Sequence, residues 1–137
     1  MTQKEIFKFI DSRKTAFIGS VDEDGFPNIK AMLAPRERDG ACLYFTTNTS
    51  SMRVGQYRSD PKASVYFFRR GLFRYTGVML KGTMEVLTDR ETKERIWRRG
   101  DTVFYKNGVA DPDYCVLRFR AASGRYYRDL KTESFTL

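Results

Sequence analysis

The amino-acid sequence predicts a small, mostly antiparallel β-barrel of about six strands with short helices at the connections. Three observations predict this class. Short runs rich in aromatic and β-branched residues recur along the chain, with Gly, Pro and Asp turns between them. Helical spacing is confined to short stretches, whereas a layered βαβ protein needs longer ones. Finally, 137 residues with 41% hydrophobic content suit a single domain, residues 1–137, with one core.

The first predicted element is a short amphipathic helix over residues 2–11. Ile6 and Ile10 fall at helical spacing, and Thr2 is followed three residues later by Glu5. This is a capping-box pattern, in which two side chains bond the free N–H groups at the start of a helix.

Three strands are predicted to follow the helix. Thr15–Val21 and Pro27–Ala34 flank the tight turn Asp22–Gly25 and are typical of a hairpin. After a second turn at Arg38–Gly40, Ala41–Thr47 is the third strand. Strands joined by short turns are normally neighbours, so we expect these three to form an antiparallel meander.

The rest of the chain combines long strands with short helices. Asp60-Pro61 and Asp111-Pro112 mark breaks, because proline does not continue a helix. Gly77 and Gly82 allow a bend or the close approach of something flat. The predicted elements are a helix over residues 51–58, a strand over Ala63–Phe68, a long strand over Phe73–Leu87, a helix from a Thr88-Asp89 cap through Trp97, and a last strand over Tyr114–Tyr127.

Composition limits the chemistry open to this chain. It has no histidine, which excludes Ser–His–Asp catalysis and most zinc sites. Cys42 and Cys115 lie in apolar stretches, so we expect buried free thiols and no disulfide or metal site. No apolar run approaches the roughly 20 residues of a membrane span, and the first residues carry no signal segment. We therefore expect a cytoplasmic protein with no membrane partner.

The chain is basic, with 25 Lys and Arg against 17 Asp and Glu and a formal charge of +8. This favours an anionic partner without identifying it. Arginines alternate with aromatic residues in segments such as Phe67–Arg70 and Arg118–Arg120, as in proteins that hold single-stranded nucleic acid. Half-buried antiparallel strands show the same alternation, and no nucleic-acid-binding motif accompanies it. We favour the sheet interpretation and keep nucleic acid as the remoter partner.

The stretch Cys42–Arg53 has the features of a phosphate site. An apolar strand ends near Thr47 in a hydroxyl-rich turn, and a helix begins near Ser51. First-turn N–H groups of a helix lack partners and favour an anion, the hydroxyls add donors, and Arg53 can hold two phosphate oxygens. An ordinary capped helix with a solvated arginine would give the same pattern.

On the second predicted strand, Lys30 and Met32 share a face because side chains alternate along a strand. A cation beside a soft apolar side chain suits a flat ring with polar edges. A solvent-facing lysine above a core methionine fits equally well. In a meander, a ligand with a charged tail and a flat ring would lie across this strand and the one that ends at the phosphate-like turn.

Several blocks of the chain resemble one known family. They are Gly25–Met32, Leu43–Arg53, Asp60–Val65 and Val78–Gly82, followed by Ile96-Trp97, Phe104-Tyr105 and Gly108–Tyr114. In this order they are similar to the pyridoxamine 5′-phosphate oxidase-like FMN-binding split barrels, and the later blocks to the general stress protein branch. The resemblance implies a six-stranded antiparallel split β-barrel, an FMN cofactor and a homodimer with two flavin sites at its interface.

The resemblance also implies which residues contact the cofactor. Residues 30–32 would lie by the flavin ring and residues 46–47 by the ring and ribityl chain. Ser51 and Arg53 would hold the phosphate, with Arg53 in place of the more usual lysine, while Met52 occupies a position that is often basic. The full set of cofactor-binding candidates is Lys30, Ala31, Met32, Thr46, Thr47, Ser51, Met52, Arg53, Trp97, Phe104 and Tyr105.

In function, the resemblance implies an FMN-dependent oxidoreductase acting on a small molecule. NAD(P)H would be a transient donor, because the chain has no GxGxxG fingerprint. Oxidases of pyridoxamine phosphate share a C-terminal extension with an Arg and His pair, and this histidine-free chain departs from them, which puts that activity in doubt. No residue is assigned as acid or base, because the flavin carries the hydride. A non-catalytic FMN store or stress sensor and a nucleic-acid-binding barrel stay as alternatives.

Overall fold

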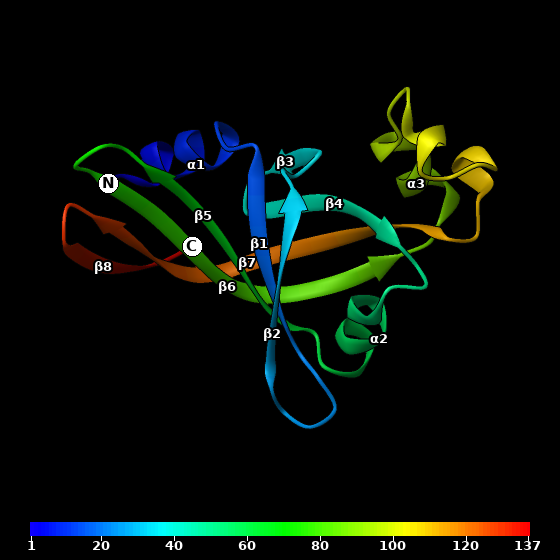
Figure 1. Ribbon diagram of the computed structural model, residues 1–137, viewed down its shortest axis with the longest axis horizontal. Helices are drawn as coiled ribbons and strands as arrows, with labels where there is room; N and C mark the ends of the chain where they lie inside the picture. The colour runs from blue at the N-terminus through cyan, green and yellow to red at the C-terminus, as the bar shows by residue number, and fades with distance from the viewer.

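The computed structural model describes residues 1–137 and contains one eight-stranded antiparallel sheet with short helices at its margins (Figure 1). The strands are β1 (Thr15–Val21), β2 (Pro27–Leu33), β3 (Glu37–Asp39), β4 (Cys42–Asn48), β5 (Lys62–Arg70), β6 (Tyr75–Leu87), β7 (Tyr114–Arg128) and β8 (Lys131–Thr136). The helices are α1 (Gln3–Asp11), α2 (Met52–Ser59) and α3 (Arg90–Ile96), with 3₁₀ turns η1 (Asp101–Val103) and η2 (Gly108–Ala110).

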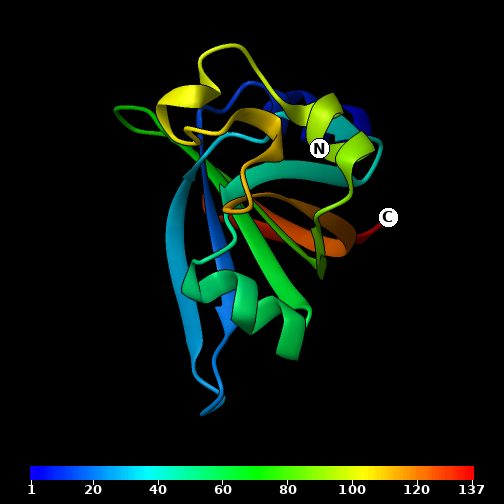
Figure 2. The same cartoon turned by 90° about the vertical axis from the view of Figure 1, so that its right-hand side faces the viewer.

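Neighbouring strands follow the order β2-β1-β5-β6-β7-β4-β3, and β8 pairs with β7. The sheet curls strongly about its core, as the view in Figure 2 shows. The two ends of the strand order, β2 and β3, are not paired with each other, so the barrel is split along that side. The predicted fold class is thus confirmed.

The expected meander of the first three long strands is wrong. β2 pairs only with β1, whereas β4 pairs with β3 and β7. The chain between β2 and β4 changes direction, because Ala34 N–H bonds Lys14 O at 3.0 Å and Arg36 N–H bonds Tyr44 O at 2.7 Å. This crossing leads the chain from the β1 side of the barrel to the β4 side.

Two strands were not predicted. β3 is only three residues long and falls in the expected turn. β8 follows a turn in which Asp129 and Leu130 both have positive φ, 48° and 71°. Such a turn usually contains Gly or Asn. Asp129 and Leu130 are neither, so this hairpin was not predicted.

The core lies inside the curled sheet and is closed at one end by α1. Ile6 and Ile10 are each 2% exposed, and Thr2 accepts the predicted cap bond from Glu5 N–H at 3.2 Å. Phe67 and Phe119 are buried in the same core, so the alternation of aromatic residues with arginines reflects a half-buried sheet. The alternation itself therefore needs no nucleic-acid partner to explain it.

Gly82 marks a bulge between β6 and β7. A Cβ at this position would lie 2.0 Å from Arg120 O, so only glycine allows the strands to approach there. The close approach expected at Gly82 is therefore made by the backbone of β7.

A second, smaller cluster attaches residues 90–113 to the barrel. Ile96 and Tyr105 pack with Tyr44, Tyr114 and Val116, which come from β4 and β7. The cluster lies at the α3 end of the molecule (Figure 1). None of the helices combines the length and hydrophobicity needed to cross a bilayer.

Candidate functional site

A cavity of about 240 Å³ opens where β2 faces the end of β4 and the start of α2. Most of the residues proposed from sequence line it: Lys30, Ala31, Met32, Thr46, Thr47, Arg53, Phe104 and Tyr105. Leu33, Ala34, Arg36, Phe45 and Asn48 complete the lining. Barrel curvature, and not strand pairing, brings β2 and β4 to the same cavity.

Three proposed residues do not line the cavity. Met52 is 77% exposed on the outside of α2. Trp97 packs behind the wall, with its ring 6.2 Å from that of Tyr105 and 5.1 Å from that of Tyr114. Ser51 is the N-cap residue of α2, but its side chain makes no cap hydrogen bond.

Buried polar atoms without partners gather at the start of α2. Ser51 Oγ, Thr49 Oγ1 and Arg53 Nε are all buried and make no hydrogen bond. The remaining bond of the Arg53 guanidinium is from Nη2 to Thr47 Oγ1, at 3.3 Å. Buried polar groups are nearly always paired in folded proteins, so this group of donors indicates a ligand with several acceptor oxygens.

Asp113 holds the turn that precedes α2. Its carboxylate accepts bonds from Asn48 Nδ2 and from Ser50 N–H, both at 2.8 Å, and Thr49 N–H bonds its backbone oxygen at 2.8 Å. Hydrogen bonds from Asn48 and Ser50 lower the pKa of Asp113 below its usual value. Asp113 therefore fixes the shape of the hydroxyl-rich turn from the start of the neighbouring strand, β7.

The other end of α2 is attached to β1. Tyr57 OH donates to Gly19 O at 2.9 Å, and burial raises the pKa of Tyr57 to about 12. The phenol therefore stays protonated and keeps its donor. Val54, also on α2, is 1% exposed, so both contacts set the position from which Arg53 enters the cavity.

The wall formed by Phe104 and Tyr105 is held by an ion pair. Arg36 donates to both carboxylate oxygens of Asp101, at 2.9 and 2.8 Å. Burial alone would raise the pKa of Asp101, but the bonds from Arg36 and from Arg98 N–H outweigh it and leave the pKa lowered. Asp101 O in turn accepts the N–H groups of Phe104 and Tyr105, both at 2.9 Å.

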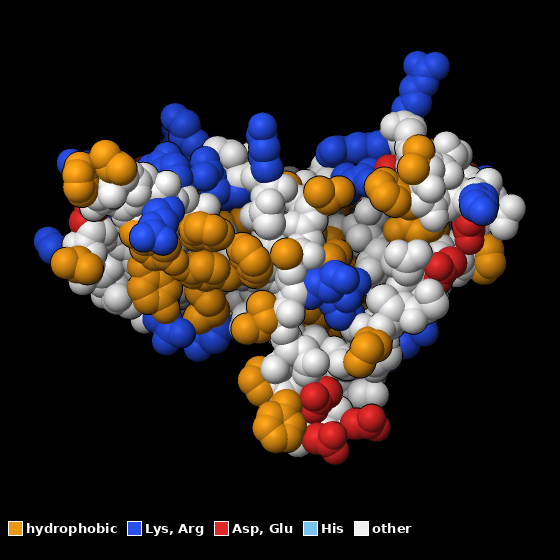
Figure 3. Space-filling view, in the orientation of Figure 1, with side chains coloured by type: hydrophobic (Ala, Val, Ile, Leu, Met, Phe, Trp, Pro, Cys, Tyr) orange, Lys and Arg blue, Asp and Glu red, His pale blue; other side chains and the backbone are white.

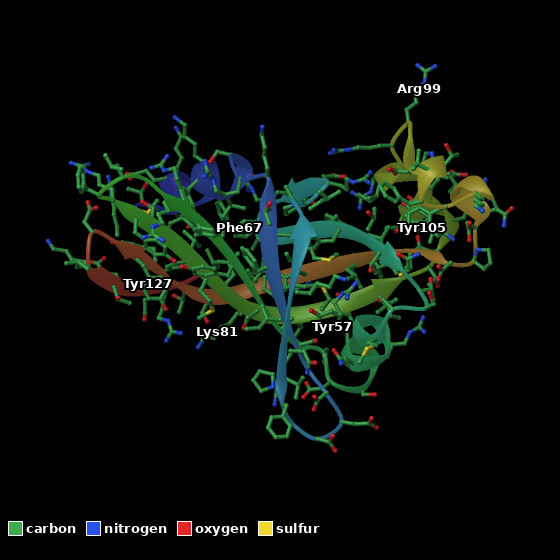
Figure 4. All side chains as sticks on the ribbon, in the orientation of Figure 1. Tyr57, Phe67, Lys81, Arg99, Tyr105 and Tyr127 are labelled. Atoms are coloured by element: carbon green, nitrogen blue, oxygen red, sulfur yellow. The ribbon has the colours of Figure 1, made fainter.

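The charge of the cavity is one-sided. Lys30 and Arg53 line it without a carboxylate partner, Arg36 is paired with Asp101, and no acidic side chain is among the lining residues. Apolar and aromatic side chains form the rest of the wall. Such a cavity suits an anion that also carries a flat, largely apolar body. Figure 4 shows Tyr105 at this end of the molecule and Tyr57 below it.

Comparison with known proteins identifies the family. Residues 2–128 match the family model described as pyridoxamine 5′-phosphate oxidase. The chain belongs to this family. Within the pyridoxamine 5′-phosphate oxidase family, it is 37% identical to a Clostridium acetobutylicum protein described as related to general stress protein 26 of Bacillus subtilis, over 100% of this chain and 97% of that one, with a TM-score of 0.86. The family and branch predicted from the sequence blocks are thus confirmed.

Other proteins are similar in fold or over part of the sequence. General stress protein 26 of Bacillus anthracis is 18% identical, with a TM-score of 0.79 over 98% of each chain. A pyridoxine/pyridoxamine 5′-phosphate oxidase of Rhizobium leguminosarum bv. trifolii is 32% identical over 74 residues, which are 54% of this chain and 34% of that protein. The match thus spans about a third of that curated relative.

Sequence reasoning missed the three residues that hold the site in shape. Arg36, Asp101 and Asp113 act over long sequence separations. Arg36 and Asp101 belong to no recognisable local motif, and the block Gly108–Tyr114 assigned no role to Asp113. Leu33 and Ala34 had a usable signal, because they continue the predicted strand beyond Met32. His, Cys, Asp and Glu side chains form no group of three or more that could hold a metal ion.

Proposed function

We propose that this protein binds FMN in the cavity between β2 and β4 and acts as an FMN-dependent oxidoreductase on a small molecule. The observation that carries the proposal is the set of unpaired buried donors at Ser51, Thr49 and Arg53. A phosphate dianion has enough acceptor oxygens to satisfy them all. The start of α2 adds main-chain N–H groups and the positive end of the helix dipole.

The rest of the cavity fits the rest of FMN. We call the unpaired donors of Thr49, Ser51 and Arg53 the phosphate corner. Thr47 is buried and Thr46 is half-buried between this corner and β2, where they suit a polyhydroxyl chain. Lys30, Met32 and Phe104 surround the space left for a flat ring. The chain thus binds and orients the cofactor at three places: a charged corner, a hydroxyl-lined path and an apolar wall.

Lys30 is the residue best placed to affect reactivity. When bound, FMN supplies hydride and electron transfer at its ring. A lysine at the ring favours the reduced, anionic form by Coulomb attraction. No carboxylate lines the cavity, and Tyr105, its one phenol, has a pKa raised by burial to about 12. The protein therefore contributes binding, orientation and charge, and NADH or NADPH is the donor we propose.

The same observation favours a second candidate, an FMN-binding protein without turnover. A cavity lined by no carboxylate, in a chain without histidine, lacks the side chains that most often act as acid or base on a substrate. Anaerobic mixing with NADH and NADPH distinguishes the two. Bleaching of the flavin absorption at a saturable rate supports the oxidoreductase, and a spectrum that stays oxidised with both donors supports the binder.

We also propose that the protein is a homodimer. The outer surface of the sheet carries a group of apolar side chains that we call the apolar face: Phe17, Ile29, Tyr66, Phe68, Tyr75 and Tyr127. Ile29 is 78% exposed, and the face borders an open groove of about 430 Å³. Figure 3 shows it as a continuous hydrophobic area to the left of β2. Exposed apolar areas of this kind usually mark an interface.

Titration of FMN with the purified protein tests the central proposal. Quenching of flavin fluorescence that saturates at one FMN per chain is the expected result. Fluorescence that stays unchanged at micromolar protein would overturn the assignment of FMN. Light scattering on the same sample tests the homodimer, which predicts twice the mass of the 16.0 kDa chain.

A further inference from the structure

Lys93 is a buried lysine without an acidic partner. It lies on α3 with only 7% of its surface exposed, and it belongs to none of the ion pairs of the chain. Lysines are almost never fully buried unless they are paired, because it costs free energy to take a charge out of water. The contacts of Lys93 therefore indicate what this buried cation does.

Both the side chain and the backbone of Lys93 are bonded to the segment that leads into β7. The ammonium group donates to Asp111 O at 3.1 Å and lies 5.2 Å from the centre of the Tyr114 ring. The backbone oxygen of Lys93 accepts a bond from Tyr114 OH at 2.8 Å. Burial raises the pKa of Tyr114 to about 12, so the phenol keeps the proton that it donates. Lys93 thus joins α3 to residues 111–114 at two points.

Asp111 extends this connection to Asp113. The Asp111 oxygen that Lys93 contacts also accepts Tyr114 N–H at 3.0 Å, which closes a tight turn at the start of β7. The Asp111 carboxylate accepts Asp113 N–H at 2.9 Å and Asn107 N–H at 3.2 Å. Asp111 is itself buried, with 8% of its surface exposed. The backbone of Asp113 is therefore held by Asp111, which Lys93 holds in turn.

Asp113 is the last member of the series, and it shapes the turn before α2. Its carboxylate and its backbone oxygen accept three hydrogen bonds from residues 48–50. The phosphate corner begins within this turn, at Thr49. In Figure 1, α3 lies above and α2 lies below the end of β4. A continuous series of hydrogen bonds thus runs from Lys93 on α3 to the start of α2.

Resting on the proposed function, we infer that Lys93 is a positioning residue for the phosphate corner. It is absent from the cavity lining and acts through Asp111 and Asp113. Hydrogen bonds weaken steeply as their angles bend, so a small rotation of the turn weakens several contacts with a dianion at once. Loss of the Lys93 bond should therefore lower the affinity for the phosphate and not the affinity for the rest of the cofactor.

Riboflavin, which has the ring and ribityl chain of FMN but no phosphate, allows this difference to be measured. Lys93→Met keeps most of the buried side-chain volume and removes the bond to Asp111. We expect FMN to bind about tenfold more weakly to this variant, and riboflavin affinity to change by less than about twofold. Lys106→Met makes the same change at an exposed lysine between α3 and β7 and should alter neither affinity. An equal loss for both flavins, or no loss for FMN, would overturn the inference.

A double substitution tests whether Lys93 acts through Asp113. Asp113→Ala already removes the link to the turn, so the addition of Lys93→Met should weaken FMN binding by less than about a further twofold. Losses that multiply would show that Lys93 acts by another route. Tyr114→Phe is a milder variant in case Lys93→Met does not fold, since it removes only the phenol bond to the Lys93 backbone. It should give a smaller loss that is again confined to FMN, and a loss confined to riboflavin would contradict the inference.

Hydrogen–deuterium exchange provides a readout that needs no flavin. The N–H groups of Thr49 and Ser50 donate to Asp113, so they should exchange about tenfold faster in Lys93→Met than in the unchanged protein. Ala34 N–H, which is bonded at 3.0 Å to the residue before β1, provides the reference rate. Equal acceleration at all three amides would indicate general destabilisation and refute the positioning role, and so would no acceleration at the first two.

Failure of the proposed function is a separate result. An unchanged protein that binds riboflavin as tightly as FMN would remove the phosphate from the proposed site. The exchange rates would then still decide whether Lys93 holds the turn. Conversely, tighter binding of FMN than of riboflavin, together with unchanged exchange at Thr49 and Ser50 in Lys93→Met, would support the phosphate corner and refute the role of Lys93 alone.

Discussion

Arg36 and Asp101, which lie 65 residues apart in the chain, form a two-point ion pair with N–O distances of 2.9 and 2.8 Å. Their side chains are only 11% and 6% exposed. Arg36 also accepts a bond from the Arg98 side chain on its backbone oxygen. One pair of residues thus joins the segment after β2 to the turn that carries Phe104 and Tyr105.

Removal of one partner of this pair should destabilise the protein. We expect Arg36→Met to lower the free energy of unfolding by about 3 kcal/mol, because it leaves a buried carboxylate without its cation. Urea unfolding measures this change. Arg36→Met combined with Asp101→Leu should recover part of the loss, since no charge is then left unpaired. A single variant within about 0.5 kcal/mol of the unchanged protein would contradict the prediction.

The same pair predicts a dependence of stability on acid. The pKa of Asp101 is lower in the folded chain than its ordinary value of 3.8. A lowered carboxyl pKa contributes stability that is complete above the unfolded pKa and is lost as pH falls through the folded pKa. The free energy of unfolding should therefore decrease below about pH 4. Asp101→Asn should flatten that decrease, and urea unfolding between pH 6 and 2.5 provides the comparison.

Arg53 and Met52 are adjacent residues that form a matched pair for mutation. Arg53→Ala should weaken FMN binding by roughly 1.5–3 kcal/mol, the scale of a charge-assisted contact. Met52→Ala should change it little, because Met52 is 77% exposed and outside the cavity. Fluorescence titration measures both affinities. Equal affinities for the two variants would mean that the phosphate corner is assigned wrongly.

Lys30→Met should separate cofactor binding from cofactor reactivity. Lys30 is exposed at the cavity edge, so screening limits its interaction with a reduced ring to about 1 kcal/mol. This corresponds to a midpoint potential about 20 mV more negative for a two-electron couple. Dye-coupled reductive titration measures the potential. An unshifted value with FMN affinity also unchanged would exclude Lys30 from the ring.

Asp113→Ala should weaken FMN binding although Asp113 is absent from the cavity lining. Without its carboxylate, Asn48 and Ser50 lose the bonds that shape the turn before α2. Asp113→Asn tests geometry against charge, since an amide oxygen can accept only one of the two bonds in place. Titration calorimetry of the three proteins should rank the unchanged chain first, Asn second and Ala last. Any other order would count against a shaping role.

Local pattern was sufficient to predict the strands but not all of their partners. Thr15–Val21 was predicted with its observed bounds, and the Thr2 cap and both long strands were found within a few residues. The meander failed because alternation tells which face of a strand is buried and nothing about its neighbour. The crossing between β2 and β4 depends on the hydrogen bonds of Ala34 and Arg36, which no local signal announces.

The candidate site shows the same division. Residues that reach the cavity from a strand or a helix start, such as Lys30, Thr46 and Arg53, follow from periodicity, turn chemistry and resemblance. Met52 and Trp97 lie outside the cavity lining, which the sequence could not indicate because the direction of a side chain depends on tertiary packing. Ion pairs between distant segments, such as Arg36 with Asp101, can be recognised only in the three-dimensional structure.

One edge of β2 has no hydrogen-bonded neighbour, so whatever contacts this edge can leave without breaking hydrogen bonds of the sheet. Because β1 is the only hydrogen-bonded neighbour of β2, the amides of β2 that point away from β1 have no ladder to break before they meet deuterium. Hydrogen–deuterium exchange at those amides reports directly on what covers this edge of β2, whether a cofactor or another molecule of the same protein. The amides that are hydrogen-bonded between β1 and β5 provide a reference exchange rate within the same molecule.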